Sequence, residues 1–250
     1  MKKVIFLLCC TAAQLGHAAP FTGFYLTGAI GGTNGQFDTS QNTEANLPAL
    51  PVDLILPSEI DLTANNVAGL LAIGYSYQFA NQFVLGLALE AGYTNITASN
   101  NAHLAVLNGM PNIFLDSHIE STLTNDFSLL FKPGYVFNQS TLFYGLIGPR
   151  WGNFKTSTSV DFSLVGDGLD LSFPYSDSVS GYEIGLTAGL GIQQNIVDHF
   201  HLGLEYVYTT YGNIDTPNAS GDAGTLGTLT DSPNAKVTTN TVMLGLTYQW

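Results

Sequence analysis

The feature of this chain that most limits its fold is a strict alternation of large apolar residues with small or polar ones. In the C-terminal segment 238–250, large apolar and aromatic residues occupy every second position: Val242, Leu244, Leu246, Tyr248 and Trp250. A strand points successive side chains to opposite faces, so a period of two gives it two chemically different faces. The segment therefore predicts a strand with one large apolar face and one small, polar face.

The same alternation recurs upstream, and strand starts near Gly23, Gln82, Thr141 and Phe200 repeat every 59 residues. Each repeat contains a strand, a long polar connection, a second strand and a short turn. The repeat predicts eight strands near 23–34, 65–79, 82–95, 122–137, 141–155, 179–193, 200–212 and 238–250. The long connections are expected near 35–64, 96–121, 156–178 and 213–237.

The chain is apolar on average, with a mean hydropathy of +0.19, and only 10% of its residues are charged, against about a quarter in soluble domains. Its apolar runs are all shorter than the roughly 18 residues that a membrane-spanning helix needs. A closed barrel leaves no unpaired strand edge in lipid. We therefore predict an all-β fold, an eight-stranded antiparallel up-and-down transmembrane β-barrel. The alternatives, a soluble β-sandwich or lipocalin-like barrel, would carry charges on the faces that hold Gly, Ala, Ser and Thr here.

The N-terminal segment has the composition of a secretory signal peptide. Lys2 and Lys3 precede an apolar run, 4–10, and small residues follow at 16–18. We expect residues 1–18 to be removed and 19–250 to form the barrel, with four long extracellular loops. A membrane anchor is the weaker alternative, since seven residues span about 10 Å as a helix. Lipidation at Cys10 is another, although Cys9 is not the small residue that normally precedes a lipidated cysteine.

Removal of residues 1–18 would leave no cysteine, and so no disulfide or thiolate site, because both cysteines lie in that segment. It would also leave four Lys and Arg against 19 Asp and Glu, a net charge of −15. This balance excludes nucleic acid as a partner, since phosphate binding requires clustered cations.

Four charged residues fall on the small, polar faces that should line the lumen: Glu90, Lys132, Glu183 and Glu205. Charged groups in a narrow barrel persist when they are paired or hydrated. We expect Lys132 to bridge one or two of the glutamates and fill the lumen, since eight strands enclose only enough space for side chains. The position of Arg150 stays open. Simple alternation turns it outward with Tyr144 and Leu146, whereas a bulge at Pro149 would turn it inward.

The sequence carries little enzymatic or metal-binding chemistry, and we expect no catalytic residues, no metal and no cofactor. His118 near Asp116, Ser117 and Ser121 is the single local cluster that resembles a hydrolytic site. The aspartates of the third connection lack the spacing of a calcium loop, so we expect them to be solvated: Asp161, Asp167, Asp170 and Asp177.

Two segments carry a resemblance to known proteins. GFYLTGAIGG, residues 23–32, resembles the first strand of OmpA-type, OmpX-type and opacity-type barrels, and TVMLGLTYQW, residues 241–250, resembles a C-terminal outer-membrane assembly signal. The chain is thus similar to small bacterial outer-membrane β-barrels. The resemblance implies the bacterial outer membrane as location, and membrane lipids, lipopolysaccharide and the barrel-assembly machinery as partners.

Three functions are compatible with these observations. The first is a non-enzymatic surface protein that supports the envelope or contacts a host surface or other extracellular partner. Apolar stretches at 47–62 and 103–116, inside the predicted connections, either pack on each other above the barrel or form the kind of exposed apolar patch that often marks an interaction site. The second is a narrow channel for ions or small solutes, with OmpW-type barrels as an analogy for hydrophobic solutes. The third is a lipid-modifying enzyme.

Overall fold

The computed structural model describes residues 20–46, 54–106, 112–166, 169–214, 219–222, 228–231 and 234–250. The expected signal peptide, 1–18, lies outside these residues, as do 47–53 and 107–111 of the two apolar stretches. Every assigned element is a strand: β1 (Gly23–Asn46), β2 (Leu54–Gln78), β3 (Phe83–Val106), β4 (Asn112–Phe137), β5 (Thr141–Gly166), β6 (Leu169–Val197), β7 (Phe200–Ile214), β8 (Ala219–Asp222), β9 (Thr228–Asp231) and β10 (Asn234–Gln249). Within the described ranges there is no helix long and apolar enough to cross a membrane.

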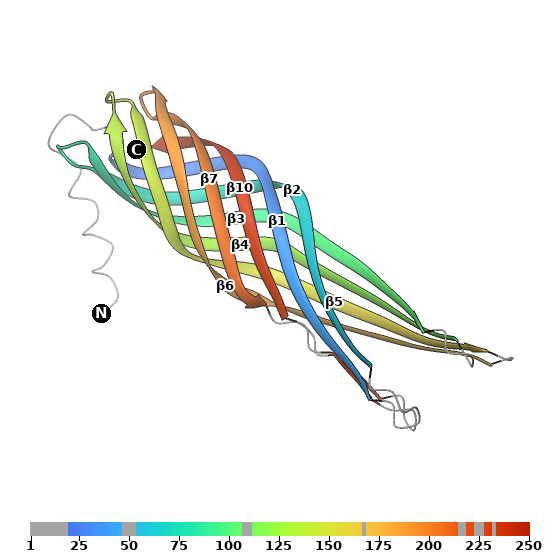
Figure 1. The fold of residues 1–250 in the computed structure, drawn as a ribbon. Coiled ribbons are helices and arrows are strands. Elements are labelled where there is room, and N and C mark those ends of the chain that lie inside the picture. The colour runs from blue at the N-terminus through green and yellow to red at the C-terminus, as the bar shows by residue number, and fades with distance from the viewer. Residues whose placement is uncertain are drawn as a thin grey trace, which may run out of the picture.

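Eight of these strands form a closed antiparallel ring, in the order β10-β7-β6-β5-β4-β3-β2-β1, with β1 also paired to β10 (Figure 1). The closing pair runs from Tyr25 opposite Gln249 to Ser40 opposite Asn234. Inside the ring, Thr27 Oγ1 lies 2.7 Å from Thr247 Oγ1 across this seam. The predicted eight-stranded antiparallel barrel is confirmed.

The outer face of the ring is apolar and exposed, the inverse of a soluble β-protein. Leu190, for example, is 70% exposed, whereas Leu130 on the inner face is fully buried. In the C-terminal strand, Val242, Leu244, Leu246 and Trp250 are exposed, while Met243, Gly245 and Thr247 between them are buried. Exposed aromatic residues mark both edges of this apolar belt, as expected at the two membrane interfaces: Phe24, Tyr77, Phe79, Phe83, Phe137 and Phe200 at one edge, and Tyr93, Phe127, Trp151, Tyr182 and Tyr208 at the other.

Tight turns join the strands at one end of the barrel, which we call the short-turn end. The turn after β2 is closed by a bond from Gln82 N to Phe79 O, 3.0 Å long, and Gln82 has a φ of 69°. Asn138 and Gln139, between β4 and β5, also have positive φ, a conformation that asparagine tolerates better than most residues. The C-terminus lies at this end, where Trp250 N donates to Phe24 O at 2.9 Å.

At the opposite, extended end, the long loops expected from the sequence are replaced by strands for most of their length. β1 pairs with β2 as far as Ala45 opposite Leu54, β3 with β4 as far as Val106 opposite Ile113, and β5 with β6 up to Gly166 opposite Leu169. The fourth connection contains the short strands β8 and β9. The prediction of long loops was wrong because polar segments are compatible with paired strands as well as with loops. In water a polar strand is stable when neighbouring strands satisfy its backbone and its side chains pair across strands.

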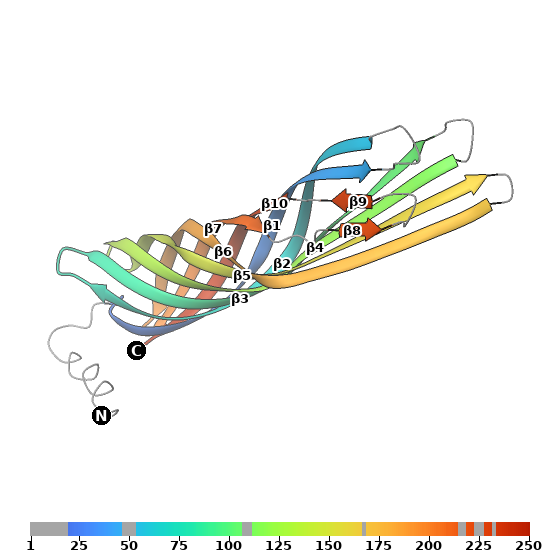
Figure 2. The same cartoon turned by 90° about the horizontal axis from the view of Figure 1, so that it is seen from below.

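The extended end divides into two sheets, because two pairings stop at the level where the apolar belt ends (Figure 2). β2 and β3 pair no further than Gly69 opposite Tyr93, and β6 and β7 no further than Gly185 opposite Tyr211. Beyond these points β3, β4, β5 and β6 form one sheet, while β2, β1, β9 and β8 belong to the other. The barrel thus supports a two-sheet extension that is part of the same strands.

Candidate functional site

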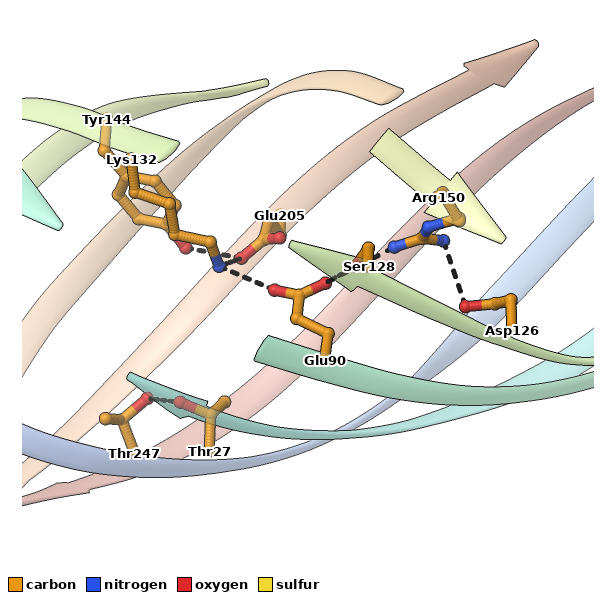
Figure 3. A network of polar contacts seen from close by, with 9 residues as sticks. All are labelled: Thr27, Glu90, Asp126, Ser128, Lys132, Tyr144, Arg150, Glu205 and Thr247. Atoms are coloured by element: carbon orange, nitrogen blue, oxygen red, sulfur yellow. Dashed lines mark hydrogen bonds and ion pairs between the residues drawn. The ribbon is translucent and has the colours of Figure 1, made fainter. Parts of the chain in front are cut away.

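Five charged side chains from four strands meet in the lumen at the level of the apolar belt (Figure 3). They are Glu90 on β3, Asp126 and Lys132 on β4, Arg150 on β5 and Glu205 on β7. Each has at least one exposed, apolar neighbour along its strand, so the same period of two that builds the outer face turns these groups inward: Leu89, Phe127, Phe131, Trp151 and Leu204 are such neighbours. We call these five residues, with Tyr144 and Ser128, the lumen network.

Lys132 connects two glutamates that come from different sides of the barrel. Its Nζ lies 2.9 Å from Glu90 Oε1 and 3.3 Å from Glu205 Oε2. Tyr144 supports the second contact, because its hydroxyl donates to Glu205 Oε2 at 2.7 Å and its ring lies beneath Lys132 Nζ, 5.5 Å from the ring centre. The ammonium group is thus held by two carboxylates and an aromatic face.

Arg150 joins the network through the same glutamate. Its Nη2 lies 3.3 Å from Glu90 Oε2, and its Nη1 lies 3.6 Å from Asp126 Oδ1. Ser128 Oγ donates to Glu90 Oε2 at 3.4 Å. Glu90, which is 3% exposed, is therefore the centre of the network, since it contacts both cations.

The lumen at this level has little free space. A cavity of about 70 Å³ is lined by residues that include Glu90, Lys132, Arg150 and Glu205, which leaves room for only a few water molecules. Arg150 Nε is buried without a hydrogen-bond partner among the described residues, so a water in this cavity is the group that would satisfy it.

Apolar clusters lie on both sides of the lumen network. Towards the short-turn end, Phe21, Val84, Val136 and Leu142 form a buried cluster, and the Phe21 ring lies 5.0 Å from the ring of His201. Ser76 Oγ donates to Phe21 O at 2.9 Å and so holds the segment before β1 inside the barrel mouth. We call this cluster the short-turn seal.

Towards the extended end, a larger buried cluster fills the space where the two sheets separate: Phe37, Ile96, Ala98, Leu123, Phe154, Tyr211, Ile214, Ala235 and Val237. The rings of Phe154 and Tyr211 meet edge to face with centres 4.9 Å apart. We call this cluster the extended-end seal. Along its axis the lumen is therefore apolar, then charged, then apolar again.

Three of the four residues expected to line the lumen as a network are brought together, namely Glu90, Lys132 and Glu205. The fourth, Glu183, occupies a half-buried position on the inner face of β6, between the exposed residues Tyr182 and Ile184. Asp126 was missed, although the alternation that places Phe127 outward and Ser128 inward also places Asp126 inward.

The question left open for Arg150 is answered by the register of β5. Arg150 is 6% exposed and faces the lumen together with Tyr144 and Leu146, while Phe143, Ile147 and Trp151 face outward. β5 keeps one register with β6 through Pro149, so no bulge re-aims the arginine. The outward orientation given by simple alternation was wrong because the phase of this glycine-rich strand was misassigned by one residue.

The histidine cluster suggested by the sequence is arranged differently in the structure. Asp116 contacts the Nδ1 atom of His103 on β3, not His118, and His118 Nδ1 contacts Asn101 Oδ1. The described residues contain no group of three or more His, Cys, Asp or Glu placed to hold a metal ion. Asp167 lies outside the described residues, and so does the side chain of Asp170.

Comparison with known sequences assigns a family to this architecture. The sequence pattern of the family described as outer membrane protein beta-barrel domain matches residues 4–249. Two relatives are the 31 kDa outer-membrane immunogenic proteins of Brucella melitensis and Brucella suis. Each is 25% identical over 248 residues, which cover 93% of this chain and 87% of the relative.

Solved structures that resemble the chain include bacterial outer-membrane and surface proteins. Neisserial surface protein A is 13% identical, with a TM-score of 0.36 over 92% of this chain and 98% of that protein. The attachment invasion locus protein Ail of Yersinia pestis, solved with the heparin analogue sucrose octasulfate, is 16% identical, with a TM-score of 0.30 over 89% and 99%.

Proposed function

Since the chain belongs to the outer membrane protein beta-barrel domain family, we propose that it is a non-enzymatic surface protein whose closed barrel anchors a strand-built platform outside the cell. Its location in the bacterial outer membrane and the resemblance to small outer-membrane barrels are confirmed by the family match and the Brucella relatives. Barrels of this class have short turns on the periplasmic side and longer connections outside. The extended end is accordingly assigned to the cell exterior.

The observation that carries this proposal is the contrast between the closed lumen and the long extension. Two apolar seals enclose the lumen network, and a cavity of about 70 Å³ is no path for a hydrated solute. In contrast, β3 to β6 continue well past the apolar belt as a paired sheet. Most of the described structure outside the bilayer is therefore the surface of paired strands. Such a surface is suited to contact with a partner and not to the transport of a solute.

Trimming one hairpin of the extension tests the proposal directly. The Oγ atoms of Thr97 and Thr122 lie 3.0 Å apart across β3 and β4, which marks a position where the hairpin can be closed by a two-residue Asn-Gly turn in place of residues 98–121. The trimmed protein should keep the heat-dependent mobility in SDS gels that closed barrels show, and lose binding of bacteria to host cells or matrix. Unchanged binding by the trimmed protein would overturn the proposal, and measurable ion conductance of the full chain would favour a channel instead.

A narrow channel is the second candidate, and the charged layer of the lumen is the observation that favours it. A path for ions would have to pass Glu90 and Lys132, so conductance in planar bilayers that changes in Glu90→Gln or Lys132→Met would support this function. The proposal of a surface protein expects no resolvable conductance from the full chain.

An enzyme of the lipid-modifying kind is supported least. His118 would need a carboxylate and a hydroxyl in reach, and its contact is with Asn101. Lipid A and phospholipid profiles that are the same in cells carrying the natural chain and His118→Ala are the expected result, and an altered profile would argue for the enzyme.

A further inference from the structure

One strand edge of the extension lies open among the described residues. β3 pairs with β4 up to Val106, but beyond Tyr93, where β2 departs, its other side has no strand partner in the part of the chain that the structure describes. Asn66 Nδ2 donates to Asn95 O at 2.6 Å and closes the lower end of the gap. From residue 96 to 106, about 36 Å of strand at 3.3 Å per residue, the backbone of β3 is free to pair.

The other edges of the extension are protected, and this one is not. Exposed edges are usually blunted by proline, by charged residues or by a covering element. The sequence of β2 from 54 to 68 includes Pro57, Glu59 and Asp61, and β6 has Pro174 and Asp177 and is approached by β8. Between residues 96 and 106, β3 contains no proline and no Asp, Glu, Lys or Arg.

The outward face of the sheet that ends at this open edge is regular and polar. The outward residues of β3 to β6 form cross-strand rows, one of which joins Ser99, Glu120, Ser157 and Ser178. On the inner face, Ile96 and Ala98 are buried in the extended-end seal. A strand added to β3 would therefore meet hydroxyl, amide and carboxylate groups on its outer face and apolar groups on its inner face.

The net charge of the extension indicates which kind of partner strand would be attracted to the open edge of β3. Beyond the apolar belt, the residues whose side chains the structure describes include two lysines, Lys155 and Lys236, against five acids, a net charge of −3: Asp38, Asp116, Glu120, Asp161 and Asp177. A second copy of the chain would bring the same negative charge to the edge and be repelled. A basic segment would be attracted.

We propose that the edge of β3 from residue 96 to 106 binds an extended basic polypeptide, which adds to the β3–β6 sheet as a further strand. Backbone hydrogen bonds supply the affinity in this mode of recognition, and alternate side chains supply the specificity. The segment that fits carries Lys or Arg at alternate positions facing outward and apolar residues between them. The inference rests on the proposed function, for which it names the partner.

A matched pair of lysine variants in one cross-strand row tests the proposal. Ser99→Lys places a cation on the open edge, whereas Ser178→Lys makes the same change three strands away, about 14 Å at the usual strand spacing. The probe is a fluorescent nine-residue peptide of alternating lysine and valine, bound to the full chain in detergent micelles, with a glutamate-valine peptide for comparison.

We expect the lysine-valine peptide to bind and the glutamate-valine peptide not to bind. Ser99→Lys should weaken binding at least tenfold, and Ser178→Lys less than twofold. Glu120→Gln should weaken it roughly threefold, the effect of one partly screened charge, and the difference between the peptides should shrink at high salt. Isotope-edited infrared spectra should show the bound peptide as a β-strand.

Equal weakening by the two lysine variants would overturn the proposal in favour of unspecific attraction to the acidic surface. A dimer seen by light scattering and abolished by Ser99→Lys would overturn it in favour of a second copy at the edge. Failure of the peptide to bind, while the trimmed hairpin variant still loses contact with host cells, would reject this partner and leave the proposed function standing. Retained cell contact after trimming would reject the proposed function itself.

Discussion

Arg150 Nη2 lies 3.3 Å from Glu90 Oε2, in an ion pair that passes over β4, the strand between β5 and β3. The same carboxylate binds Lys132 through its other oxygen, 2.9 Å away. Three strands are therefore fixed to one another from inside the lumen, in addition to their backbone pairing. Because Glu90 is nearly fully buried, water cannot replace either cation as its partner without cost.

The central position of Glu90 predicts a large loss of stability in Glu90→Gln. The change leaves Lys132 and Arg150 with one carboxylate each, and removing one member of a buried ion pair costs about 3 kcal/mol. Urea unfolding in detergent micelles and the temperature at which the compact SDS-gel band disappears measure the effect. Asp198→Asn, at an exposed residue of a short turn, is the control and should change stability by less than about 0.5 kcal/mol. Equal stability of the two variants would contradict the network.

Two glycines of β6 should respond differently to the same substitution. A methyl group on Gly191 would overlap the end of the Tyr144 ring and displace the hydroxyl that donates to Glu205. Gly181 has open space within 4 Å of the position its methyl group would take. We expect Gly191→Ala to cost about 1 to 2 kcal/mol in urea unfolding, the effect of one charge-assisted hydrogen bond, and Gly181→Ala to be neutral. A neutral Gly191→Ala would show that Tyr144 is not held by Glu205.

Substitution of Phe21 tests whether the lumen is closed by more than the short-turn seal. Phe21→Ala should lower stability by about 3 kcal/mol, because the ring is 1% exposed in the short-turn seal. It should nevertheless leave the barrel without resolvable single-channel conductance, since the lumen network and the extended-end seal remain. Planar bilayer recordings check the second part. Steady conductance in this variant would mean that the short-turn seal alone closes the lumen.

Trp250 tests the expected assembly signal. Trp250 is 60% exposed, and its ring packs edge to face on Tyr248 with centres 5.0 Å apart, so it is available to a partner during insertion. Trp250→Ala should lower the amount of heat-modifiable protein in the outer-membrane fraction severalfold. Trp151→Ala, at an exposed belt residue of the same type, is the control and should insert normally. Similar losses in both variants would point to a general need for interfacial aromatic residues.

The strand faces at belt level could be read from the sequence, with β5 as the exception. In β5, Gly145 and Gly148 interrupt the alternation. The even-numbered and the odd-numbered positions both contain large apolar residues, so the sequence does not show which set faces outward. Only its pairing with β6, Arg150 opposite Gly185, decides which face is the lumen. The long connections were misread for a different reason, because polar residues in water are equally compatible with loops and with paired strands.

The sequence by itself determined that this chain forms a lipid-facing barrel and that Glu90, Lys132 and Glu205 point into it. Lipid imposes one simple rule, large apolar groups at every second position, and this rule is local enough to be visible within single strands such as 238–250. Only the tertiary structure decided which charges meet, where the lumen is sealed and which strand edge stays open. Those features depend on the register between strands and on contacts between residues far apart in the chain, such as Glu90 and Arg150, which no local period encodes.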